Sequence, residues 1–413
     1  MSTSPFDPSP SLADDTRTMK RLALNHRRNV EQDQTDMIDA ATAAFDYAAC
    51  RSEAWNPEPF SLLWGTPVWE QASASQRVLL NQLYWVAYYA QIISAEIATI
   101  YFNQSSAAAL YGMEDFRLVC DTLDLESAQE RAHINAFRRI GEAVEHALFG
   151  ERVFTYAMRG PFVETMIHSD AGALQRRWKS VQLRAFGLLS AGSAFIGCQY
   201  FTIRGVRTLN GKIVQHQLSQ YYQGHPRQDS APIPSRVSYH HFQDESYHFN
   251  TSMIVSQDAV ASLPPPTRFE RAVIEASLRG CQRDHFHFST AMNGIFWYDP
   301  SLFGAVYRIL RSPHFGLDRA GALDLMTRSF GQENDGNLAS ARTHATARES
   351  YRRYLADMNH LGGESREMTF MGRSDLAGHL QRNRAAMARF ARTAPEQVAS
   401  ASPSALAPAS VAA

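Results

Sequence analysis

A ten-residue stretch from His240 to Phe249 (HHFQDESYHF) contains three histidines and two carboxylates. If this stretch is helical, His241, Glu245 and His248 fall within an arc of about 60° on one face of the helix. Mixed carboxylate and imidazole ligands without thiolates suit iron or manganese. The stretch therefore predicts one half of a transition-metal site. His240 points about 100° away from His241 and is expected outside that site.

A second segment repeats the spacing of the glutamate and the histidine. Glu130-x-x-His133 lies in LESAQERAHINAFRRIGEAVEHALF, as Glu245-x-x-His248 lies in the first stretch. Residues three apart on a helix project from one face, so each pair can hold one metal ion. Two such helices, with single carboxylates from two further helices, form the dinuclear metal site of a four-helix bundle. The alternative is that Glu130 and Glu245 are solvated charges on helix surfaces.

Glu96 is the candidate for one of the single carboxylates. It is the only acidic residue in the apolar segment LLNQLYWVAYYAQIISAEIATIYFNQ. A buried carboxylate has to be neutralised, paired or bound to a metal, because an unpaired buried charge is costly. Asp244, directly before Glu245, is expected either to orient a ligand imidazole through its free ring nitrogen or to be an exposed helix charge.

The order of these residues resembles the ferritin-like di-iron oxygenases, and within them the p-aminobenzoate N-oxygenase (AurF-type) family. The pattern that carries the resemblance is His241-x-x-x-Glu245-x-x-His248, because this family has a histidine one turn before the glutamate. The resemblance covers about residues 75–260. It implies that Glu130 and Glu245 bridge two iron ions, and that the iron ligands are Glu96, Glu130, His133, His241, Glu245 and His248.

The resemblance also implies a glutamate on the third long helix, and this chain has none between Ala171 and Tyr239. Three explanations stay open. Gln199 takes the position as a weaker ligand, a nearby acid such as Glu126 or Glu164 compensates, or one iron keeps an open coordination position.

The resemblance implies an O2-dependent non-haem di-iron monooxygenase of natural-product biosynthesis, with N-oxygenation of an amine as the first expectation. The alternative is a di-iron hydroxylase or desaturase that acts on a C–H bond of an acyl substrate, either a small molecule or a group bound to a carrier protein. A third interpretation is a non-catalytic or ferritin-like metal-binding protein. Either enzyme would need an external electron donor, because the sequence has no flavin, iron–sulfur or nicotinamide motif.

Other polar residues are weaker candidates for a functional site. His285 and His287 lie two residues apart, so on a helix they face different ways and are expected to be structural. Arg204, Arg207 and Lys212 could recognise a substrate carboxylate, although a solvated helix end is the preferred interpretation.

Helical periodicity dominates the chain and predicts an all-α protein, for which the resemblance implies a ferritin-like four-helix bundle core with additional helices. We expect disorder over 1–15 and in the Ala/Pro/Ser-rich tail 393–413. Residues 16–392 are expected to form one helical domain, with the metal-binding bundle at about 75–260 and a helical C-terminal extension. Gly205 or Asn210-Gly211 is expected to interrupt the longest helix. The predicted helices span 16–51, 75–103, 125–148, 171–222, 236–261, 267–293, 302–310, 318–330, 340–358 and 374–391.

The composition is that of an ordinary soluble globular protein. The 413 residues are 45% apolar and 20% charged with a formal net charge of −1, which argues against a nucleic-acid surface. No segment approaches the roughly 20 apolar residues of a membrane span, and the N-terminus lacks a signal-peptide pattern. The four cysteines have no CxxC spacing and are expected to be reduced. These features predict a cytoplasmic protein without nucleic-acid or membrane partners. A homodimer through the apolar residues 296–298 stays open.

Overall fold

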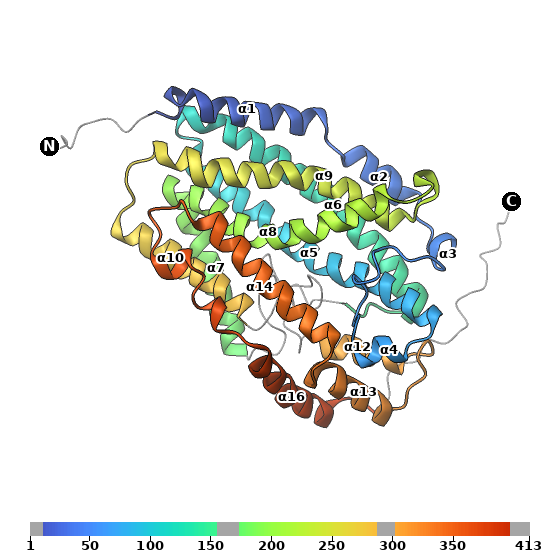
Figure 1. The fold of residues 1–413 in the computed structure, drawn as a ribbon. Coiled ribbons are helices and arrows are strands. Elements are labelled where there is room, and N and C mark those ends of the chain that lie inside the picture. Colours follow the sequence, from blue (N-terminus) through green and yellow to red (C-terminus); the bar gives the residue numbers. More distant parts are fainter. Residues whose placement is uncertain (1–10, 155–172, 287–301, 397–413) are drawn as a thin grey trace.

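The computed structural model describes residues 11–154, 173–286 and 302–396, and within these ranges the chain is helical without a β-strand (Figure 1). The all-α prediction is therefore confirmed for this part of the chain. The α-helices are α1 (Thr16–Glu31), α2 (Thr35–Ala43), α3 (Tyr47–Cys50), α4 (Pro67–Gln71), α5 (Ala74–Leu110), α6 (Arg117–Phe149), α7 (Ala173–Gly192), α8 (Ala194–Gln223), α9 (Ile233–Met253), α10 (Arg268–His285), α12 (Phe303–Arg311), α13 (Arg319–Gly331), α14 (Asp335–Leu355), α15 (Gly363–Arg366) and α16 (Leu376–Thr393).

Four long helices, α5, α6, α8 and α9, surround a common interior. Helix α5 lies against α6 and α8, and α9 lies against α8 and α6. Helix α5 begins at a capping box, in which the Ser73 hydroxyl accepts from the Gln76 backbone N–H and the Gln76 side chain accepts from the Ser73 N–H. Its aromatic side chains Tyr84, Trp85 and Tyr88 are fully buried. The interior is therefore apolar where α5 enters it.

The N-terminal helices cover one side of this interior. Helix α1 packs on α6 and α9, and α2 packs on the same two helices (Figure 1, blue). The predicted single helix over 16–51 is wrong, because the chain turns after Glu31 and again before Asp46. The Asp46 carboxylate accepts from the Ala48 backbone N–H and so caps the short helix α3.

The long helix predicted over 171–222 divides at Gly192 and Ser193, and the predicted breaks at Gly205 and at Asn210-Gly211 are wrong. Ser193 has an extended backbone, and its hydroxyl accepts from the Ile196 N–H at 3.2 Å, which starts α8. A Cβ atom on Gly205 would lie 2.1 Å from the Tyr354 hydroxyl. Gly205 therefore permits close packing of α14 on α8 instead of ending the helix.

Helix α7 lies against α5 and α8, and further helices pack on other sides of the interior. Helices α10 and α14 contact α8, and α16 contacts α13 (Figure 1). Leu12–Asp14, in the segment expected to be disordered, forms a short 3₁₀ helix. Within the described ranges, no helix has both the length and the apolar character needed to cross a membrane. The predictions for Glu164, His287, residues 296–298 and the outermost terminal residues lie outside the described ranges.

Candidate metal centre

The six predicted ligands meet in the interior of the four long helices. They form two overlapping groups whose donor atoms lie within 4.8 Å of one another, and Glu245 belongs to both groups. The first group contains Glu96, His133, His241 and Glu245, and the second contains Glu130, Glu245 and His248. Helix α5 supplies one of these residues, α6 supplies two and α9 supplies three.

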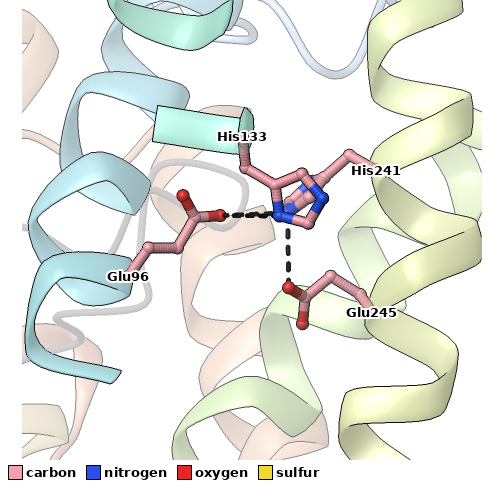
Figure 2. Close-up of side chains that lie close together, drawn as sticks. All are labelled: Glu96, His133, His241 and Glu245. Carbon is pink, nitrogen blue, oxygen red and sulfur yellow. Dashed lines mark hydrogen bonds and ion pairs between the residues drawn. The ribbon is translucent and has the colours of Figure 1, made fainter. Parts of the chain in front are cut away.

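In the first group, two carboxylates face two imidazoles (Figure 2). Glu96 Oε1 lies 3.1 Å from His241 Nε2 and 3.7 Å from His133 Nδ1. Glu245 Oε1 lies 3.5 Å from His241 Nε2. The His133 and His241 rings are 4.7 Å apart between centroids. All four side chains therefore direct a donor atom at one small volume.

In the second group, Glu130 and Glu245 share the imidazole of His248. His248 Nδ1 lies 3.2 Å from Glu245 Oε1 and 3.4 Å from Glu130 Oε1. The other Glu130 oxygen, Oε2, lies 3.4 Å from His133 Nδ1. Glu130 thus contacts one histidine on each side of the cluster, which is the position a bridging carboxylate needs.

Three polar side chains hold the outward ring nitrogens of the histidines. Asp244 Oδ2 lies 3.1 Å from His133 Nε2, and Gln129 Oε1 lies 2.9 Å from His248 Nε2. The third, Gln215, has its Nε2 3.4 Å from His241 Nδ1. For His133 and His248, a proton on Nε2 leaves the Nδ1 lone pair directed into the cluster.

The carboxylates repel one another in this buried space. Burial raises the pKa of Glu96 well above its ordinary value, and the nearby Glu130 carboxylate raises it further. Burial opposes protonation of His133, but hydrogen bonds to Asp244 and Glu130 outweigh it and raise the His133 pKa to about 9. Cations placed between these groups would relieve the repulsion between the carboxylates.

The residues fit metal ions in three respects. The donors are three carboxylates and three imidazoles, a set that suits iron or manganese. Glu96 is only 4% exposed, and its Oε2 atom is buried without a hydrogen-bond partner. Tyr89 and Phe137 line one side of His241, with ring centroids 5.7 and 4.9 Å from the imidazole. The cluster can therefore bind metal, and the identity and number of the ions stay a prediction.

The structure places the proposed substitutes for the missing glutamate in different surroundings. The Gln199 oxygen lies 2.9 Å from His360 Nε2 and accepts from the Thr202 hydroxyl, so Gln199 is not a ligand. Glu126 is fully buried and its Oε2 accepts from Arg204 at 2.6 Å, whereas its Oε1 has no hydrogen-bond partner among the described residues. The Glu126 carboxylate also raises the pKa of His248, so Glu126 stays a candidate for the compensating acid. The sequence pattern could not show which face of α8 meets the interior, because that depends on packing.

The interpretation of Arg204 and Arg207 as a solvated helix end is wrong. Arg204 is 4% exposed and also donates to the His248 carbonyl oxygen at 2.7 Å, which ties α8 to α9. Arg207 donates to Asp284 of α10 at 2.6 Å. His240 is bonded to Gln34 at 2.8 Å and lies outside the cluster.

Gln129 and Gln215 are the functional candidates that the sequence interpretation missed. A signal for Gln129 was present, because it precedes Glu130 as Asp244 precedes Glu245. In both cases, the residue before the glutamate contacts the histidine of the other motif. Gln215 has no such signal, because it contacts His241 only through the packing of α8 on α9.

The described part of the chain is thus all-helical and contains a buried cluster that can bind metal. A family model described as "Acyl halogenase CylC-like" matches residues 17–391, and the chain belongs to this family. Searches of curated proteins and of solved structures gave no match.

The family corrects two expectations. The chain belongs to the acyl halogenase family and not to the p-aminobenzoate N-oxygenase family. The expectation of amine N-oxygenation, which rested on that resemblance, is therefore wrong as well. The pattern His241-x-x-x-Glu245-x-x-His248 specifies which groups face the cluster. It does not specify the reaction, because reaction and substrate depend on surroundings that these ligands do not encode.

Proposed function

We propose that this protein is a metal-dependent halogenase that replaces a hydrogen of an acyl substrate with a halogen. The family match over residues 17–391 is the observation that carries the proposal. The buried cluster supports it, because an oxidative reaction at a C–H bond needs a redox-active centre shielded from water. We further propose that the centre holds two iron ions in a ferritin-like bundle.

The proposed reaction balances with O2 as the oxidant. A C–H bond breaks and a carbon–halogen bond forms, so the substrate carbon and the halide together give up two electrons. An external donor supplies two more electrons, and the four electrons with four protons reduce O2 to two waters. Three of these protons come from solution and one from the substrate. When bound, the metal pair supplies the place where O2 is reduced.

The residues around the cluster would orient the histidines and exclude water. Asp244 Oδ2 holds the proton on His133 Nε2, and Gln129 Oε1 holds the proton on His248 Nε2. Both imidazoles then keep an unprotonated nitrogen for the metal. Phe137 and Tyr89 exclude water beside His241.

The second candidate function is hydroxylation or desaturation of an acyl C–H bond at the same centre. The donor set favours it equally, because the ligands determine oxidation chemistry and not the group transferred. A third, non-catalytic role in metal binding would use the same ligand set but is not favoured by the family match.

Product analysis separates these functions. The protein is loaded anaerobically with Fe(II) and mixed with O2, a reductant, chloride and an acyl chain, supplied as the free acid and as a carrier-protein thioester. We expect a chlorinated acyl product with the chlorine isotope pattern, and a brominated product when bromide replaces chloride. The His248→Ala variant serves as the inactive control. A hydroxylated or unsaturated product in the presence of chloride would favour the second function, and no product with either substrate form would contradict both.

A further inference from the structure

The cluster receives no carboxylate from α8. Bundles of this type place a glutamate on each of four helices. Here Glu96, Glu130 and Glu245 come from α5, α6 and α9, and Ala194–Gln223 contains no Asp or Glu. The group of Glu130, Glu245 and His248 accordingly offers three donor residues, whereas the other group offers four.

Contacts between α8 and α9 identify the part of α8 that faces the cluster. Arg204 donates to the His248 carbonyl, and Gln215 contacts His241, so α8 and α9 run antiparallel. Thr208 and Gly211 lie four and seven residues after Arg204, on the same helix face, between these two contacts. Both therefore lie opposite Glu245. Gly211 is buried and carries no side chain that could reach a metal ion.

Lys212, the next residue, is half-buried beside this position. Its ammonium nitrogen lies 4.4 Å from the Phe249 ring centroid, one turn after Glu245 on α9. The Lys212 side chain forms no hydrogen bond or ion pair within the described part of the chain, and its contact is with the Phe249 ring. Burial lowers the pKa of Lys212, and Glu245 partly offsets that effect. The Lys212 amino group thus has no anionic partner at contact distance among the described residues.

The charges around the cluster then leave an excess of positive charge. Two divalent ions would bring four positive charges and Lys212 a fifth. The three glutamates and Asp244 supply four negative charges, and Arg204 is balanced by Glu126. A buried net charge is unfavourable unless a counterion accompanies it. The missing counterion belongs on the α8 side, where a fourth carboxylate is absent.

We propose that a halide ion binds on the α8 side of the cluster, beside Gly211 and Lys212, next to the metal held by Glu130, Glu245 and His248. This inference rests on the proposed function, which makes a halide the second substrate. A spherical anion suits the position, because it needs positive charge and space but no directed hydrogen bonds. Gly211 places no side chain there, although its carbonyl oxygen lies 3.5 Å from the Tyr88 hydroxyl, and Lys212 and the metal ions would supply the charge.

Bromide binding to the metal-loaded chain tests the inference without turnover. Protein loaded anaerobically with Fe(II) is dialysed against bromide, and bound bromide and metal are counted per chain. The X-ray absorption fine structure at the bromine edge shows whether a metal neighbours the bromide. We expect one bromide with a metal neighbour in the loaded protein and none in the metal-free protein.

Two variants locate the anion, each with its own control. Gly211→Glu supplies the fourth carboxylate and should abolish bromide binding while both metals stay bound. Gly211→Ala, the control, should keep the metals and the bromide. Lys212→Gln should weaken bromide binding by about tenfold, the effect of losing one charge-assisted contact. Lys20→Gln, at an exposed lysine of α1, should leave bromide binding unchanged.

Several results would overturn the inference. One is that bromide in the loaded protein has no metal neighbour. Another is that metal-free protein binds bromide equally well. The third is that the Gly211→Glu variant keeps both metals and also binds bromide. If Gly211→Glu does not fold, the absorption measurement and Lys212→Gln still decide. A halogenated product without bromide at the metals would refute the site and leave the proposed function standing. Bromide at the metals with only hydroxylated product would refute the function instead.

Discussion

Two residues at matching positions present different polar groups to the histidines of the cluster. Asp244 and Gln129 each precede a cluster glutamate, and each contacts a histidine of the other helix. Asp244 presents a carboxylate to His133, whereas Gln129 presents a neutral amide to His248. A carboxylate makes the bound imidazole a stronger ligand, so the two halves of the cluster are electronically unequal.

Replacing Asp244 tests this arrangement at a single atom. The Asp244 carboxylate contacts His133 Nε2 through Oδ2 and accepts from the Gln34 backbone N–H through Oδ1, at 3.1 Å. Asp244→Asn replaces this carboxylate with a neutral amide. We expect metal affinity to fall by about 10–100-fold, measured by competition with a chelator. Asp36→Asn, at an exposed position of α2, is the control. Unchanged affinity in Asp244→Asn would mean that Asp244 does not support a ligand.

At the scale of single residues, spacing predicted the cluster members well. Residues three and four apart on a helix share a face, so Glu130 with His133 and Glu245 with His248 were recognisable as pairs. Gln199 was one of three explanations for the missing glutamate, because sequence does not reveal how α8 is rotated. Its side-chain oxygen contacts His360 and Thr202 instead.

At the scale of elements, a buried ion pair fixes α8 against α6 and α9. Arg204 is bonded to Glu126 of α6, to the His248 carbonyl and to the Ser252 hydroxyl. Glu126 has no other charged partner at contact distance among the described residues. The pair therefore positions the helix that carries Gly211 and Lys212, without touching the cluster donors.

Breaking this pair should destabilise the fold. We expect Arg204→Met to lower the free energy of unfolding by about 3–5 kcal/mol, because Glu126 would remain as an unpaired buried charge. Denaturant unfolding of metal-free protein measures this separately from metal binding. The double variant Glu126→Leu/Arg204→Met should recover part of the loss. In contrast, Arg279→Ala breaks an exposed pair with Glu364 and should change stability by about 1 kcal/mol or less. A loss that small in Arg204→Met would contradict the assignment.

Helix boundaries were predictable only where local signals agreed with packing. The apolar run of α5 was recognisable, although the helix extends to Leu110. Gly205 suggested a break, yet the contact with Tyr354 gives the glycine a packing role within a continuous helix. The actual break lies at Ser193, whose side chain caps α8. In the sequence, Ser193 cannot be distinguished from the many serines that cap no helix.

At the scale of the whole molecule, the N-terminal helices hold two of the residues that contact the cluster histidines. Gln34 at the start of α2 bonds Asp244, and Asn29 of α1 accepts from Gln129 at 3.0 Å. Helices outside the four-helix interior thus hold the residues that orient the histidines. The sequence predicted an all-α chain and the cluster. It did not reveal the reaction, because the atoms around a substrate come from the packing of distant segments.

The central claim is that one interior holds two metal ions through the six clustered side chains, with Glu245 shared between them. The most direct test is the metal content of anaerobically Fe(II)-loaded protein after removal of free metal, compared with that of Glu245→Ala. We predict two irons per chain for the native protein and loss of most of both in the variant, because Glu245 belongs to both donor groups. A native protein that retains no iron, or a variant that still holds two, would contradict the claim.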